Sequence, residues 1–178
     1  FRFANQTMWK QRVHTVAIEK RREDDTLTLR AALGAADEPA HRSWRPFQLA
    51  FVLLCLPSLS DPAHPERTES GALADLQFFP TGGGKTEAYL GLVAYTLATR
   101  RLQGVVGTGD DAVDGRDGVA VLMRYTLRLL TAQQFQRAAT LMCAAELLRQ
   151  DRARLDDRYK GHPFRLGMWV GGSVSPIK

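Results

Sequence analysis

Residues 80–86 read Pro-Thr-Gly-Gly-Gly-Lys-Thr, and this stretch is the most informative part of the chain about its fold. Residues 74–79 precede it and are predicted as a short strand, and a helical pattern follows from Lys85 to about Leu102. A glycine turn between a strand and a helix is the setting of a phosphate-binding loop. Glycines let backbone N–H groups curl around phosphate oxygens, and the helix N-terminus adds unpaired N–H groups and the positive end of its dipole.

The nucleotide-binding residues that this stretch predicts are Thr81, Gly82, Gly83, Gly84, Lys85, Thr86 and Glu87. Lys85 would supply a point charge to the β and γ phosphates, and the Thr86 hydroxyl would bind Mg²⁺. These two are the candidate catalytic residues. Glu87 either holds the water shell of the metal or caps the helix, and the sequence leaves both roles open. The general pattern has a small residue where this chain has Phe79.

Two further apolar runs, at residues 119–123 and 164–170, are predicted as strands, and a long helical stripe covers 127–149. Strands that alternate with helices indicate parallel pairing through helical crossovers. The sequence therefore predicts an α/β domain over 44–178, with a parallel sheet and helices on both faces, behind an N-terminal helical extension over 1–43. Another helix should begin at Pro46 and end before Pro57, since proline suits a first turn.

Composition narrows the class of protein. The chain has 178 residues, with 24 Lys and Arg against 19 Asp and Glu, a formal net charge of +5 and 44% hydrophobic residues. These values argue against a disordered chain. Two cysteines cannot form a disulfide framework, and no metal site is expected beyond nucleotide-bound Mg²⁺. No membrane span or export signal is recognisable, so a cytoplasmic location is expected.

Two segments flank the glycine stretch. Upstream stands Arg45-Pro46-Phe47-Gln48, and downstream Arg124-Tyr125-Thr126-Leu127-Arg128 runs on to Gln133. With these segments the chain resembles the first RecA-like domain of superfamily 2 helicases, a P-loop NTPase. The resemblance implies that Gln48 and Arg45 form its adenine-recognising Q motif, so that the cofactors are ATP and Mg²⁺. It also implies a second RecA-like domain as partner.

The same resemblance implies a nucleic-acid interface, to DNA rather than RNA. Its residues would be Arg124, Thr126, Arg128, Gly171 and Gly172. The family's motif II, a pair of carboxylates that serves Mg²⁺ and the attacking water, has no counterpart in the chain. We therefore expect a motor segment cut before motif II, active in the whole protein and inactive alone.

A narrower resemblance rests on the runs 44–48, 78–91 and 123–139. They look like the helicase-like subunits of the bacterial DISARM antiphage systems, whereas CRISPR-associated helicase-nucleases match less well outside the glycine stretch. This implies an ATP-dependent DNA helicase or translocase in antiphage defence, acting with other subunits. Two alternatives stay open: a nucleotide-sensing scaffold that does not hydrolyse ATP, and a P-loop kinase or other small NTPase, for which the Arg-x-x-Gln segment is not expected.

Overall fold

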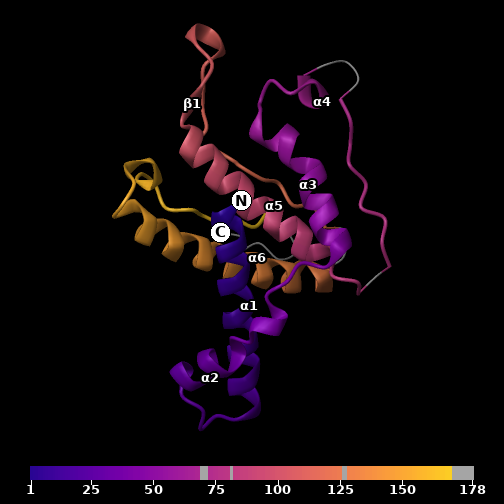
Figure 1. Cartoon of the computed structure of the whole chain (residues 1–178), viewed down its shortest axis with the longest axis vertical. Coiled ribbons are helices and arrows are strands. Elements are labelled where there is room, and N and C mark those ends of the chain that lie inside the picture. Colours follow the sequence, from indigo (N-terminus) through magenta and orange to yellow (C-terminus); the bar gives the residue numbers. More distant parts are fainter. Residues whose placement is uncertain (69–71, 81, 126–127, 170–178) are drawn as a thin grey trace, which may run out of the picture.

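The computed structural model describes residues 1–68, 72–80, 82–125 and 128–169, and the side chains of these except 68 and 128–131. In chain order the elements are α1 (Arg2–Glu23), α2 (Leu29–Ala36), η1 (Pro39–His41), α3 (Pro46–Ser60), α4 (Pro65–Thr68), α5 (Lys85–Gln103), β1 (Val105–Val106), η2 (Gly109–Asp111), β2 (Val113–Asp114), α6 (Arg128–Ala153) and η3 (Asp157–Tyr159). Figure 1 shows α1 against α5 and α6, with α2 folded back on the far end of α1.

The predicted α/β architecture, a RecA-like parallel sheet with helices on both faces, is wrong. Among the described residues the sheet has two short strands, β1 and β2, paired antiparallel. The segments 74–79, 119–123 and 164–169 are not strands, and residue 170 lies outside the described residues. Their apolar side chains are largely in solvent, with Leu76 84%, Phe78 92% and Leu122 89% exposed. An apolar run forms a strand only where another strand pairs with it, and local pattern does not encode that partner.

The three long helices share a hydrophobic core. Ala4 of α1 and Leu90 and Ala94 of α5 meet Leu141 of α6, and these side chains are at most 2% exposed. Trp44 packs against this cluster, and its indole N–H donates to the Asn5 side chain over 2.9 Å. Burial of apolar side chains between helices is the main contribution that stabilises such an assembly.

The helix that follows the glycine stretch is confirmed, since α5 runs from Lys85 to Gln103. The long helix is confirmed as well, although α6 extends to Ala153. The predicted end of α3 before Pro57 is wrong, because the helix continues through that proline to Ser60. A proline removes one helical N–H, and the Ser58 hydroxyl donates to the Cys55 carbonyl nearby.

Arg149 fastens the segment that follows α6. Its side chain is 9% exposed and donates to the Glu146 carboxylate over 2.7 Å and to the Tyr159 carbonyl over 2.7 Å. Glu146 also accepts the Phe164 N–H over 3.0 Å. Residues 159–164 are therefore held by a buried guanidinium with a carboxylate partner and a carbonyl partner. In the described part of the chain they are not held by hydrogen bonds to a neighbouring strand.

Arg101 of α5 holds the same segment from the other side. It is 4% exposed and donates to the carbonyls of Lys160 and His162 over 2.8 and 2.6 Å. Its guanidinium also lies 5.1 Å from the centre of the Phe164 ring, within range of a cation–π contact. The two arginines thus join α5, α6 and the segment 159–164 into one unit.

The stability of this unit is expected to depend on pH through the Glu146 carboxyl. Burial raises the pKa of Glu146, but hydrogen bonds from Arg149, Gln150 and the Phe164 N–H outweigh burial and lower the pKa to about 2. A carboxyl whose pKa is lower in the folded than in the unfolded chain stabilises the folded state fully at pH values above the unfolded pKa, which is about 4.3. This contribution is lost as the pH falls toward the folded pKa.

We therefore compare wild type with Glu146→Gln by hydrogen exchange of residues 157–164 in the whole protein, corrected for intrinsic exchange rates. The difference in local opening free energy should be constant at neutral pH and shrink steadily below about pH 4.3. A difference that is equal at neutral pH and at about pH 3 would contradict this expectation. Asp151→Asn, which removes an exposed ion pair with Arg154 and leaves Glu146 untouched, serves as the control and should show no such change with pH.

Within the described ranges no helix is both long and apolar enough to cross a membrane.

Candidate nucleotide-binding site

The glycine stretch forms a tight turn at the start of α5. Gly82 and Gly84 have φ angles of 81° and 94°, the left-handed region that favours glycine. A Cβ on Gly83 would lie 2.8 Å from the Phe79 ring, and one on Gly84 would lie 2.8 Å from the Gln48 amide nitrogen. The turn therefore requires glycine both for its backbone angles and for its space, as a loop that wraps an anion does.

Lys85 lies across the turn that it follows. Its ammonium donates to the carbonyls of Phe79 and Pro80, the latter over 3.2 Å. The side chain therefore lies on the loop side of the helix N-terminus, where the dipole of α5 is positive. Phosphate oxygens placed over the turn would offer this ammonium stronger acceptors than the two neutral carbonyls.

Arg45 and Gln48 reach the turn from α3. The Arg45 guanidinium donates to the Gly83 carbonyl over 2.6 Å, and the Gln48 amide donates to the Gly84 carbonyl over 2.7 Å. The Gln48 side-chain oxygen also accepts the Arg45 N–H over 2.9 Å, which caps α3. Gln48 is 5% exposed, so the structure places both predicted Q-motif residues at the glycine turn, with both ends of the amide engaged.

Phe79 occupies the position where the general pattern has a small residue. Its ring stacks on Phe47, with 3.8 Å between centroids and 8° between planes. The stack joins the residue before the glycine turn to the first turn of α3, and it accommodates the larger side chain. Sequence reasoning missed Phe47, although it lies inside the Arg-Pro-Phe-Gln segment.

Thr86 and Glu87 belong to the first turn of α5. Glu87 forms an ion pair with Arg137 of α6, and the two side chains are 38% and 32% exposed. Sequence reasoning missed Arg137 because its partner is 50 residues away and neither residue carries a motif for the pair. Thr81 lies outside the described residues.

The candidate nucleic-acid residues are described only in part. Arg124 is exposed at the end of the extended segment before α6, and Arg128 is the first residue of α6. The side chain of Arg128 is not described, and Thr126, Gly171 and Gly172 lie outside the described residues. Of this predicted interface the structure therefore locates the single side chain of Arg124.

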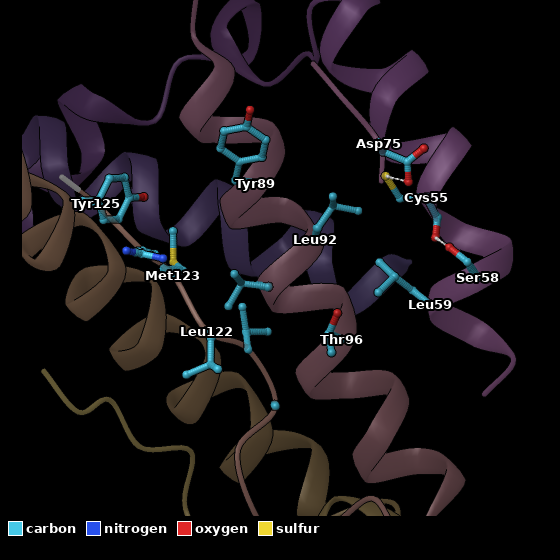
Figure 2. A pocket seen from close by; sticks show the side chains of 14 residues that line it. Cys55, Ser58, Leu59, Asp75, Tyr89, Leu92, Thr96, Leu122, Met123 and Tyr125 are labelled. Carbon is cyan, nitrogen blue, oxygen red and sulfur yellow. Dashed lines mark hydrogen bonds between the residues drawn. The ribbon is translucent and has the colours of Figure 1, made fainter. Parts of the chain in front are cut away.

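A cavity of about 470 Å³ lies between α3, α5 and the segment 120–125. Figure 2 shows Cys55 and Asp75 on one wall and Tyr125 and Met123 on the other, with Tyr89 of α5 between them. The Cys55 thiol lies 3.7 Å from the Asp75 carboxylate, and burial, with the nearby negative charge, raises the pKa of Cys55 to about 11. The thiol therefore stays protonated at neutral pH and is a poor nucleophile. Within the described part of the chain no three His, Cys, Asp or Glu side chains converge as a metal site.

Comparison with known proteins gives one informative match. No protein-family profile matches the chain. The DISARM protein DrmA of Bacillus paralicheniformis is 40% identical over 180 residues, which cover 100% of this chain. The chain is similar to a DISARM protein. Because it spans 14% of the length of DrmA, the aligned region is a small part of that relative, and it includes the glycine turn, α3 and α6.

Proposed function

We propose that the chain is the nucleotide-binding part of an ATP-dependent DNA helicase or translocase that acts with other subunits in antiphage defence. The main support for a nucleotide site is the glycine turn at the N-terminus of α5, with Lys85 lying across it. Similarity to the DISARM protein DrmA supports the defence role. The whole protein is expected to be the active unit.

The chain's own residues would bind and orient the triphosphate. Main-chain N–H groups of the turn and of the first turn of α5 would meet phosphate oxygens, and the Lys85 ammonium would leave the carbonyls of Phe79 and Pro80 for them. The Thr86 hydroxyl would bind Mg²⁺. When bound, ATP with its metal supplies the phosphoryl group whose transfer drives movement. Arg124 and Arg128 would contact the nucleic-acid backbone, so binding there should weaken steeply with salt.

The direct test is ATP hydrolysis by the whole protein, measured as phosphate release with and without single-stranded and duplex DNA. Turnover that DNA stimulates supports the proposal. Tight ATP binding without turnover under either condition would instead favour a nucleotide-sensing scaffold. Absence of ATP binding would overturn both functions.

Gln48→Ala tests whether the glutamine reads the base. An amide can donate to and accept from the adenine edge, but in this structure both of its ends are engaged by the Gly84 carbonyl and the Arg45 N–H. If Gln48 exchanges these bonds for adenine, the variant should lose roughly tenfold in its preference for ATP over GTP, the effect of one or two hydrogen bonds. Competition titrations with a fluorescent nucleotide measure this ratio.

Gln103→Ala provides the matched control. Gln103 ends α5, the helix that begins at the glycine turn, and like Gln48 it donates its amide to a carbonyl, that of Ser60. It should leave both affinities unchanged. Equal weakening of ATP and GTP by Gln48→Ala would remove the adenine role and leave Gln48 as a support of the glycine turn.

A further inference from the structure

Glu87 touches two parts of the molecule at once. One carboxylate oxygen is paired with Arg137 of α6. The other oxygen lies 3.6 Å from the position that a Cβ on Gly84 would occupy. The carboxylate therefore stands between the glycine turn and α6, and a ligand on the turn would change its surroundings directly.

Arg137 faces the segment that precedes α6 as well. Met123 packs against the cluster that contains Ala138 of α6, and Tyr125 lines one cavity together with Gln134 and Ala138, which flank Arg137 along the helix. Burial raises the pKa of Tyr125 and the positive charge of Arg137 acts in the opposite direction, in agreement with this packing. Tyr125 directly follows Arg124, the described residue of the predicted nucleic-acid interface. Figure 2 shows Tyr125 at the edge of the cavity beside α6. Arg137 thus connects the first turn of α5 with the segment 124–125.

The pair is too exposed to be a strong source of stability. Ion pairs between partly exposed side chains contribute little to stability, so the bond can be exchanged at little cost. Its charges, however, lie beside a site proposed to take a polyanion and a divalent cation. Even near a protein surface, charges a few ångströms apart interact by several times more than such a pair contributes.

We propose that the Glu87–Arg137 pair couples occupancy of the glycine turn to the nucleic-acid affinity of the segment 124–125; this inference rests on the function proposed above. In the empty site Glu87 neutralises Arg137. In the filled site Glu87 turns to the water shell of the nucleotide's metal, and Arg137 loses its carboxylate partner. The released positive charge adds to that of Arg124, so nucleotide raises the affinity for nucleic acid. By linkage, nucleic acid raises the affinity for nucleotide by the same factor.

The experiment uses the whole protein, a labelled single-stranded DNA and a non-hydrolysable ATP analogue with Mg²⁺. Fluorescence anisotropy gives the DNA dissociation constant with and without the analogue, and the ratio is the coupling factor. Wild type should give a factor of about 5 or more, as is usual for coupled sites. Arg137→Gln should bring the factor close to one, and because Glu87 then has no cation to leave, analogue binding without DNA should be kept or strengthened. Arg137→Lys, which keeps the charge, should keep part of the coupling.

Glu87→Gln should also remove coupling, and the double variant should behave like Arg137→Gln, because the two side chains act as one unit. Arg154→Gln is the matched control. Arg154 directly follows α6 and pairs with Asp151 in the last turn of that helix, 14 residues and about 21 Å along the helix from Arg137, so the change should leave the coupling factor unchanged.

Four results would overturn the inference. Arg137→Gln could keep the wild-type coupling factor, or wild type could bind both ligands without coupling; in either case the nucleotide function still stands. Arg137→Gln could instead lower the melting temperature and weaken both ligands together, which would show a purely structural pair. Failure of wild type to bind the analogue at all would overturn the proposed function and this inference together.

Discussion

Replacing Lys85 by alanine in the whole protein should lower ATP turnover by at least about 100-fold, the usual effect of removing one group that stabilises transition-state charge. Like Arg45, the lysine is a cation at the glycine turn, where its ammonium reaches the carbonyls of Phe79 and Pro80. Alanine keeps the backbone of the turn and favours the first turn of α5. The variant should therefore lose phosphate contacts without losing the fold.

Phosphate release measures the loss, and circular dichroism with a melting curve checks the fold. Lys160→Ala is the control, because this exposed lysine forms an ion pair with Asp157 far along the chain from the turn. It should keep full turnover. A Lys85→Ala protein that hydrolyses ATP at the wild-type rate would remove the glycine turn from the catalytic site.

The largest effect on stability is expected from Arg149→Ala. This change leaves the Glu146 carboxylate, 17% exposed, without its cation and frees the Tyr159 carbonyl. Loss of one partner of a buried pair costs about 3 kcal/mol or more, since the remaining charge is not resolvated. The segment 159–164 should therefore open locally more than about 100-fold more often, because 1.4 kcal/mol is a factor of ten.

Hydrogen exchange of residues 157–164 in the whole protein measures this opening. Arg154→Ala is the comparison, since its pair with Asp151 spans 3.8 Å and its side chain is 79% exposed. That variant should change the opening free energy by less than about 0.5 kcal/mol. Equal effects of the two variants would mean that Arg149 does not hold the segment.

The helices that flank the glycine turn were predicted correctly from local sequence signals. The sheet was predicted wrongly because strands depend on pairing with distant segments. Lys85 opens α5 as expected because a glycine in the left-handed region precedes it, a signal contained in four neighbouring residues. Val119 and Leu122 look like a buried strand by composition, yet they are 71% and 89% exposed. A strand depends on hydrogen-bonded neighbours that the run of side chains does not specify.

In the candidate site, too, local sequence signals were predictive and contacts between distant residues were not. That Gln48 belongs near the turn follows from its segment, but its bond to the Gly84 carbonyl joins residues 36 apart. The Glu87–Arg137 pair spans 50 residues, and both members are ordinary charged helix residues in the sequence. Contacts of this kind depend on how α3, α5 and α6 cross, which side-chain periodicity alone does not determine.

The β1–β2 hairpin projects beyond the end of α5 (Figure 1). At its base the Arg100 guanidinium donates to the carbonyls of Gly115 and Asp117 over 3.2 and 3.0 Å, and the Gly115 N–H donates to the Gly104 carbonyl over 2.8 Å. These bonds isolate the tip from the chain that continues toward Arg124. A reporter peptide inserted at Asp110 should therefore leave the residues on which binding would depend in place.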